Sequence, residues 1–381
     1  MNLISKLPNV GTTIFTVMSQ LAQQHNAVNL SQGFPDFDCS PELIELVNSF
    51  MKKGFNQYSP MMGVKELREG IAQKTEDLYG SVYHPEKEVT VTAGGSEAIF
   101  SSIASVINPG DEVIIFEPAY DIYRPSVELF GGIVKAVQLK SPDFQIDWQE
   151  VRNLVSDKTK LIVLNNPNNP ATSVLTEIDF RELTQIVQNT DILILSDEVY
   201  EHIVFDGIQH LSISQFPELK ERSFLTASFG KLYHITGWKI GYVLAPEFLT
   251  KEFRKVHQFN AFCVNTPIQY AIAEFLKRKE EYLNLSAFFQ EKRDFFIEGL
   301  SQTKFKFLKP KGTYFLLGDY SEISDVNDVE FSKFLTENHQ VTVVPVSAFY
   351  ENSPDQKLVR FCFAKKEETL EKAIENLRYL G

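Results

Sequence analysis

Between residues 89 and 196 the sequence alternates short apolar runs with longer amphipathic stretches. The runs EVTVTAG, EVIIFEP, IVKAVQL, TKLIVLNN and DILILSDE are rich in β-branched residues, as buried strands are. Stretches with helical character, such as SEAIFSSIASVI, lie between them. Strands separated by helices form βαβ units, which build parallel sheets with both faces covered. The sequence therefore predicts an α/β fold with a mainly parallel central sheet covered by helices.

Polar residues follow the apolar runs, at residues 94–97, 117–120, 165–169 and 197–200. In open α/β sheets, ligands bind outside the carboxyl ends of the strands. We therefore expect these four segments to form one ligand site at a single edge of the sheet.

The pattern changes after about residue 280. A long amphipathic helix is expected at roughly 280–302, followed by strands at FKFL, GTYFLLGD, VTVVP and LVRFCFA and by a charged helix at the end of the chain. This order predicts a smaller α+β domain over residues 281–381, beside a large domain over residues 35–280.

The run SFGKLYHITGWKIGY, residues 228–242, combines an amine with groups that bind an anion. Lys231 follows Ser228 by three residues, and Lys239 lies eight residues further on. An amine can condense with an aldehyde, while a hydroxyl and a second ammonium can hold a phosphate. Pyridoxal 5′-phosphate carries both groups. The alternative is a surface lysine in a loop, which is the usual situation of an isolated lysine.

Two further motifs suit an anion or a ring. In TAGGSEA, Gly94 and Gly95 let the backbone approach an anion at the start of a helix; an ordinary strand-to-helix turn is an equal alternative. The motif is neither a dinucleotide fingerprint nor a P-loop. In NNPNNPAT the prolines indicate a turn, which allows Asn169 to point its amide at a ligand without requiring it.

Charged and aromatic residues complete the candidate site. Asp197 directly follows a buried strand and needs a cation such as a protonated pyridine nitrogen, while Tyr200 could donate to a ring oxygen. Tyr120 could stack on a flat ring, or belong to the core. Arg360 lies within an apolar strand, where it could clamp a carboxylate or form an internal salt bridge. Asp197 could also be an ordinary helix amino-terminal residue.

Composition narrows the class of protein. The chain has 381 residues, with 37 basic and 50 acidic residues and a formal net charge of −13, which argues against nucleic-acid binding. Cys39, Cys263 and Cys362 have neither disulfide-framework nor metal-site spacing. No signal peptide and no membrane span is evident, so a cytoplasmic enzyme without a metal is expected.

These motifs together resemble the fold-type I pyridoxal-phosphate aminotransferases, above all the branch that contains kynurenine aminotransferase, glutamine transaminase K and bacterial methionine aminotransferase. The resemblance extends over the whole chain through PNVGTTIF, LSQGFPDF, NQYSPMMGV, TAGGSEA, EPAYDIY, NNPNNP, SDEVYEH, SFGKLYHITGWKIGY, KVHQFNAFCVNTP, KGTYFLL and RFCFAKKEETL. It implies that residues 1–34 join the smaller domain. One departure is that Ala171 and Thr172 follow Pro170 where the family has N-P-x-G, which puts the contact of Asn169 in doubt.

The resemblance also implies a role for each site residue. Lys231 would hold the cofactor as an internal aldimine and act as general base, Asp197 would pair with the pyridinium, and Tyr120 would stack on the ring. The remaining implied contacts are Tyr200 and Asn169 to the ring 3-oxygen; Gly95, Ser96, Ser228, Lys239 and the partner subunit's Tyr58 to the phosphate; Arg360, Asn169 and the Gly33 backbone to the substrate α-carboxylate; and Phe15, Phe262 and Phe349 in the pocket wall.

The predicted activity is transfer of the α-amino group of methionine or an aromatic or large neutral amino acid to a 2-oxo acid, by ping-pong kinetics in a homodimer. No second arginine for a distal carboxylate can be placed in the pocket segments. Three alternatives stay open: a β-lyase acting on cysteine S-conjugates or cystathionine, a kynurenine–oxoglutarate transaminase, and a ligand-sensing regulator. The last is disfavoured because the motifs leave no room for a DNA-binding segment.

Overall fold

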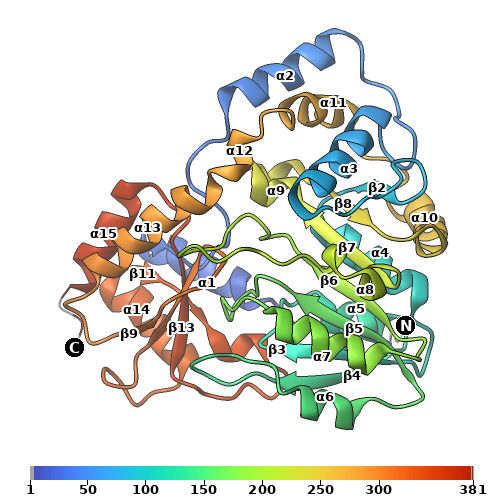
Figure 1. Ribbon diagram of the computed structural model, residues 1–381. Helices are drawn as coiled ribbons and strands as arrows, with labels where there is room; N and C mark the ends of the chain where they lie inside the picture. The colour runs from blue at the N-terminus through green and yellow to red at the C-terminus, as the bar shows by residue number, and fades with distance from the viewer. Residues whose placement is uncertain (1–3, 379, 381) are drawn as a thin grey trace.

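A seven-stranded sheet forms the centre of the molecule, in a computed structural model that describes residues 4–378 and 380 (Figure 1). Its strand order is β2-β8-β7-β6-β5-β3-β4. The strands are β2 (Val89–Thr92), β3 (Glu112–Glu117), β4 (Ile133–Gln138), β5 (Thr159–Asn165), β6 (Leu193–Asp197), β7 (Ser223–Ser228) and β8 (Gly241–Leu244). β4, β3, β5, β6 and β7 pair in parallel, whereas β8 is antiparallel to both β2 and β7. The predicted α/β class with a mainly parallel sheet is confirmed.

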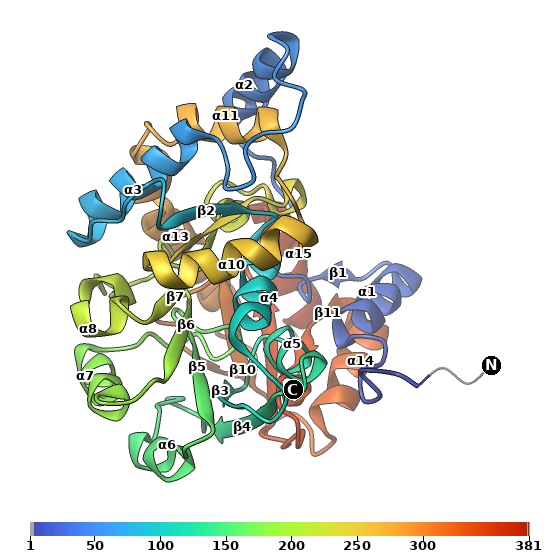
Figure 2. The ribbon, with the colours of Figure 1, turned by 90° about the vertical axis from the view of Figure 1, so that its right-hand side faces the viewer.

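Each face of the sheet has its own apolar core, because side chains alternate along a strand. On β3, Val113 and Ile115 belong to one core, and Ile114 and Phe116 belong to the other. The first core is closed by α4 (Gly95–Val106), α5 (Tyr123–Leu129) and α10 (Glu247–Asn260). The second is closed by α3 (Lys65–Tyr79), α6 (Trp148–Leu154), α7 (Glu177–Val187) and α8 (Pro217–Lys220), and Figure 2 shows α6 and α7 apart from α4 and α10.

A second, antiparallel sheet has the order β12-β13-β10-β9. Its strands are β9 (Lys306–Leu308), β10 (Phe315–Asp319), β12 (Val344–Pro345) and β13 (Leu358–Cys362). The helices of this part are α12 (Glu280–Leu283), α13 (Leu285–Gly299), α14 (Asp328–His339) and α15 (Glu367–Leu377). The single helix expected over 280–302 was wrong in detail: it is interrupted at Asn284, a residue whose side chain competes with helical hydrogen bonds, and α13 ends at Gly299.

The amino-terminal segment lies against the carboxyl-terminal part. α1 (Ile14–His25) contacts α14, and β1 (Val28–Asn29) pairs in parallel with β11 (Val341–Thr342). α2 (Pro41–Lys52) and α11 (Thr266–Phe275) pack together at the opposite end (Figure 1). The short remaining elements are α9 (Phe229–Leu232), η1 (Ile213–Gln215), η2 (Thr236–Trp238) and η3 (Val346–Phe349). Within residues 4–378 and 380, no helix is both long and apolar enough to span a bilayer.

The strand directions bring the polar segments to one edge. β2, β3, β5, β6 and β7 all end there, at Thr92, Glu117, Asn165, Asp197 and Ser228. β8 runs the other way, so it starts at the same edge with Gly241. One connection of the chain, from Ser228 to Gly241, therefore presents both Lys231 and Lys239 at this edge.

Candidate active site

A cavity of about 350 Å³ lies at this edge of the sheet. Most of the residues predicted from the sequence line it: Phe15, Gly33, Gly95, Ser96, Tyr120, Asn169, Asp197, Tyr200, Ser228, Lys231, Lys239 and Arg360. The sequence did not indicate several others, including Gln32, Phe34, Asp121 and Phe315. The structure thus brings together segments that are far apart in the sequence, and it does so around Lys231.

Lys231 is a half-buried amine, and its hydrogen-bond partners among the described residues are neutral oxygens. Its Nζ donates to the Gly33 carbonyl oxygen at 2.9 Å and to the Tyr314 hydroxyl at 2.8 Å. Burial is the main reason that its pKa falls from 10.5 to about 8, and nearby Arg360 adds to the effect. An amine of this pKa is a useful nucleophile and base near neutral pH. Tyr314 was not predicted, although it lies in the quoted motif KGTYFLL.

Asp197 is a buried carboxylate at the end of β6, with 2% of its surface exposed. Tyr123 donates to its Oδ2 at 2.6 Å, and the Val199 N–H donates to Oδ1 at 3.3 Å. Burial raises the pKa of Asp197 to about 6, although the Tyr123 hydrogen bond opposes that rise. Among the described residues no cation lies within 4.0 Å of this carboxylate. A positively charged ring nitrogen is the kind of partner that would complete it.

A cradle for an anion is formed where α4 begins. Gly94 precedes the helix with φ +83°, and the first residues of α4, Gly95 and Ser96, line the cavity together with Ser228, so that an anion there could meet the free N–H groups of the helix start. Lys239 has φ +54° and extends toward Gly94. Gly241 allows this approach, because a Cβ there would lie 2.6 Å from the Ala227 carbonyl oxygen and 2.9 Å from the Gly94 carbonyl carbon.

Arg360 is buried in β13, with 1% of its surface exposed. Its guanidinium donates to Asn169 Oδ1 at 2.6 Å and to the Ser31 carbonyl oxygen at 3.0 Å, and it stacks on the Phe315 ring at 3.9 Å. Its Nε has no hydrogen-bond partner, and no carboxylate of residues 4–378 lies within 4.0 Å. The internal salt bridge considered from the sequence is therefore wrong. A buried cation without a counter-ion marks a place for an anion.

The aromatic residues predicted in the wall divide into two groups. The Phe15 and Phe349 rings lie 5.3 and 4.9 Å from the Arg360 guanidinium, and the two rings contact each other edge to face. Phe15 lines the cavity, whereas Phe349 is not among the lining residues. Tyr58 and Phe262 lie outside the cavity of their own chain and contact each other, with 82% and 41% of their surfaces exposed. Their predicted roles stay predictions.

The turn after β5 forms without the glycine of the family motif. Thr172 has φ +59°, a conformation that favours glycine, and its N–H donates to the Asn168 carbonyl oxygen at 2.9 Å. Asn169 is fixed by this turn and by the bond from its N–H to Asn165 Oδ1 at 2.7 Å. Its side chain lines the cavity and accepts from Arg360.

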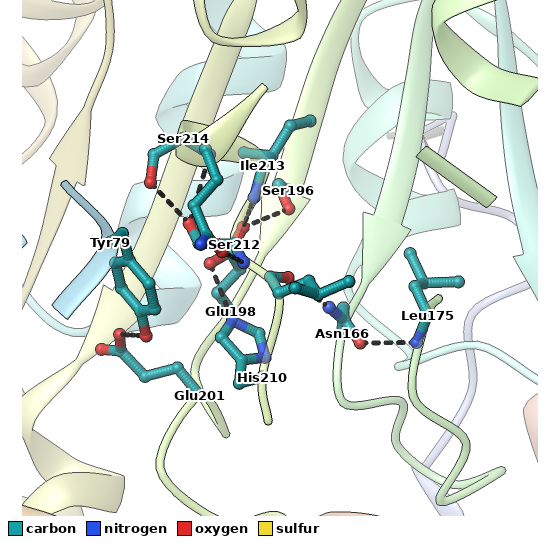
Figure 3. Close-up of polar contacts among 12 residues, drawn as sticks. Tyr79, Asn166, Leu175, Ser196, Glu198, Glu201, His210, Ser212, Ile213 and Ser214 are labelled. Atoms are coloured by element: carbon teal, nitrogen blue, oxygen red, sulfur yellow. Dashed lines mark hydrogen bonds and ion pairs between the residues drawn. The ribbon is translucent and has the colours of Figure 1, made fainter. Parts of the chain in front are cut away.

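A second buried carboxylate, that of Glu198, directly follows Asp197 in the chain, and Figure 3 shows its contacts. Glu198 accepts from Ser196 Oγ at 2.9 Å and from the Ile213 N–H at 2.9 Å, and it pairs with His210 Nε2 at 3.0 Å. Nearby, Tyr79 donates to Glu201 at 2.6 Å. The SDEVYEH motif therefore serves two purposes: Asp197 faces the cavity, while Glu198 holds the chain that follows β6.

The side chains around the cavity fit the groups of pyridoxal phosphate: an amine could meet the aldehyde, a carboxylate could face a cationic ring, and the start of α4 could receive the phosphate. The chain belongs to the class I and II aminotransferases, whose family model matches residues 25–377. This family depends on pyridoxal phosphate and acts on amino acids and 2-oxo acids, so the resemblance found in the sequence is confirmed.

Individual relatives cover nearly the whole chain. Methionine aminotransferase of Escherichia coli K12 is 50% identical over 377 residues, which are 99% of this chain and 98% of that protein. Human kynurenine–oxoglutarate transaminase 1 is 35% identical over 395 residues, covering 94% of this chain and 93% of that protein. The crystal structure of YbdL from Escherichia coli, identified as having a methionine aminotransferase function, superposes with a TM-score of 0.97 at 49% identity and covers 100% of both chains.

Proposed function

We propose that this aminotransferase uses pyridoxal 5′-phosphate held by Lys231, and that it moves the amino group of methionine or of aromatic and other large neutral amino acids to a 2-oxo acid. The observation that carries the proposal is the pairing of a buried Arg360 that lacks a counter-ion with a Lys231 amine of lowered pKa in one cavity. Arg360 suits the α-carboxylate of an amino acid, and Lys231 suits proton transfer at the neighbouring Cα.

The residues divide the cofactor's groups among them. Lys231 binds the aldehyde carbon, and Ser96, Ser228 and Lys239 bind the phosphate with the N–H groups at the start of α4. Asp197 keeps the ring nitrogen protonated, with Tyr123 holding the carboxylate in place. When bound, the cofactor supplies an electron-withdrawing ring that stabilises negative charge at the substrate Cα. Tyr120 and Tyr200 border the space that the ring would occupy.

The substrate is oriented by its α-carboxylate. Arg360 binds this group, and the Gly33 N–H, which has no acceptor in the described part of the chain, is the second donor. The Lys231 Nζ would be the base that takes the proton from the substrate Cα, and the same amine would hold that proton for its return. Because the amino acid and the 2-oxo acid both need Arg360, the first product must leave before the second substrate binds, which requires ping-pong kinetics.

The walls of the cavity favour a neutral side chain. Phe15, Phe34 and Phe315 line it, and sulfur–aromatic contacts suit methionine. Within residues 4–378, the cations that line the cavity are Lys231, Lys239 and Arg360. Each of them already has a role in the proposal, so none is left to bind a second carboxylate on the substrate side chain. The similarity to methionine aminotransferase supports this preference, and the kynurenine relatives support an aromatic alternative.

A homodimer is part of the proposal. Tyr58 and Phe262 expose large aromatic surfaces away from their own cavity, as residues that complete a neighbouring subunit's site would. Sedimentation of the purified protein tests this: a dimer that dissociates on Phe262→Asp is expected, and a monomer with full activity would exclude it. The cytoplasmic location stays a prediction from the sequence.

The decisive experiment is an absorbance titration of the purified holoenzyme. The visible band should bleach when methionine is added, and faster than when glutamate is added. It should return when a 2-oxo acid is added. Lys231→Ala should retain cofactor binding but lose turnover. Release of pyruvate and ammonia from a cysteine S-conjugate without any oxo acid would instead favour the β-lyase, and a preference for glutamate would contradict the proposed substrate class.

A further inference from the structure

Residues 31–34, called the strap here, connect β1 to the segment that leads to α2, and they form one wall of the cavity. The carbonyl oxygens of the strap accept from three cationic side chains. Ser31 accepts from Arg360 at 3.0 Å, and Gly33 accepts from Lys231 at 2.9 Å. Gln32 and Phe34 both accept from Lys365, at 3.5 and 2.8 Å.

Residues 31–34 form bends rather than a strand, yet the partners of their carbonyl groups alternate along the chain. The carbonyls of Ser31 and Gly33 point toward the cavity, where Arg360 and Lys231 lie. Those of Gln32 and Phe34 point outward, and both reach the same ammonium group. Lys365 is therefore the outer counterpart of the two cations that the proposed reaction uses.

The outer side of the strap is poorly supported by packing. A groove of about 500 Å³ lies there, and Gln32 and Phe34 line both this groove and the active-site cavity. The strap is thus a thin wall between two hollows, and hydrogen bonds must hold it. Besides Lys365, the exposed Asp36 ties the chain to the start of α15, accepting from the Lys366 N–H at 2.5 Å and from Thr369 Oγ1 at 2.6 Å.

Lys365 itself is unusual for a lysine, because it has 3% of its surface exposed and no carboxylate within 4.0 Å among the described residues. Burying an ammonium without a counter-ion is costly unless other acceptors compensate for the lost water. The compensating acceptors are the two strap carbonyls, together with the Phe34 ring at 5.1 Å. A surface lysine would avoid this cost, so the buried position indicates that the contact with the strap is required.

We propose that Lys365 is a positioning residue for substrate binding: by fixing the outer carbonyls of the strap, it holds the Gly33 N–H beside Arg360 and Phe34 at the cavity wall. This inference rests on the proposed binding of the substrate carboxylate by Arg360 and Gly33. Loss of Lys365 should leave the Lys231 chemistry intact but make the carboxylate site less ordered. Substrates should therefore bind more weakly, while turnover at saturation stays close to that of the parent.

The test uses the holoenzyme and 3-phenylpropanoate, a carboxylate that lacks the reactive amino group, with its dissociation constant read from the cofactor absorbance. Lys365→Met should weaken binding about tenfold and raise KM for methionine similarly, because an ordering contact is worth about 1.4 kcal/mol. kcat should change less than about twofold. Lys365→Arg keeps the charge and should restore most of the affinity. Lys372→Met is the matched control, since Lys372 lines the same groove on α15 without contacting the strap.

Each outcome decides the question. Unchanged affinity in a folded Lys365→Met variant, or equal weakening by Lys372→Met, would overturn the inference, and the second result would indicate a general effect of positive charge. If Lys365→Met does not fold, Asp36→Asn loosens the strap from the exposed side and should weaken binding about threefold; no change would again overturn it. A parent enzyme that neither binds the carboxylate nor transaminates would refute the proposed function instead.

Discussion

Tyr123→Phe isolates the contribution of one hydrogen bond to cofactor binding. Tyr123 is buried, and its ring packs in the core beside α4, so the substitution keeps the packing and removes only the donor to Asp197 at 2.6 Å. A hydrogen bond to a charged group stabilises it by about 1.5–3 kcal/mol, so its loss should raise the pKa of Asp197 by about one unit at least. From a starting value of about 6, the pKa in the variant becomes about 7.

The consequence depends on pH, because only the ionised carboxylate binds a cationic ring. With pKa values of about 6 and about 7, the ionised fractions differ about 1.1-fold at pH 8, about twofold at pH 7 and about fivefold at pH 6. The assay is the dissociation constant of pyridoxamine 5′-phosphate, which lacks the aldehyde and so reports non-covalent binding. The ratio of variant to parent constants at each pH cancels the ionisation of the free ligand. A ratio that is constant from pH 6 to pH 8 would refute the reasoning and leave Tyr123 a packing role only.

Four other predictions concern charged side chains in the core and in the cavity. Lys74 pairs with buried Glu201 at 2.6 Å, so Lys74→Met leaves this carboxylate without its cation. The free energy of unfolding, measured in urea, should fall by about 3–5 kcal/mol. If the double variant Lys74→Met/Glu201→Gln regains none of this stability, loss of the pair is not the cause. Burial opposes ionisation of Glu201, but Lys74 and His202 lower its pKa from 4.5 to about 2. The stabilisation that the ionised Glu201 gives is therefore present above pH 4.5 and is lost as the pH falls through about 2. In acid titrations between these two pH values, the free energy of unfolding of the parent should fall by about 3 kcal/mol more than that of the Lys74→Met/Glu201→Gln variant. In cofactor-free protein, the rate of imine formation between Lys231 and pyridoxal should rise through about pH 8 and level off; a rise that continues to about pH 10.5 would contradict the lowered pKa. Arg360→Met should reduce kcat/KM for methionine about 100-fold or more, and an unchanged value would exclude Arg360 as the carboxylate site.

Much of the site could be predicted because the polar segments follow the strands directly. Asp197 and Ser228 end β6 and β7, and a sheet brings such ends together whatever the loops between them do. The fold class followed from the same alternation of apolar runs. These inferences needed only local patterns and the rule that ligands bind at the carboxyl edge.

What the sequence did not show depends on contacts between distant segments. Tyr123 and Tyr314 contact Asp197 and Lys231 across separations of 74 and 83 residues. In the sequence each is one aromatic among 14 tyrosines, so nothing distinguishes it from a core residue. The role of Lys365 is similar, since its acceptors are backbone carbonyls, which every residue has. The turn at Thr172 shows the converse: the departure from the family motif suggested a different turn, yet threonine adopts the left-handed conformation that glycine favours.

The reversed direction of β8 determines which part of the chain carries both Lys231 and Lys239. Lys231 and Lys239, to which the proposed function assigns the aldehyde and the phosphate, lie on one short connection between two paired strands, Ser228 to Gly241. If β7 and β8 separated, this connection would lose its fixed ends, and both amines would be displaced together. Under the proposed function, separation of this strand pair would therefore release the cofactor at its aldehyde end and at its phosphate end together.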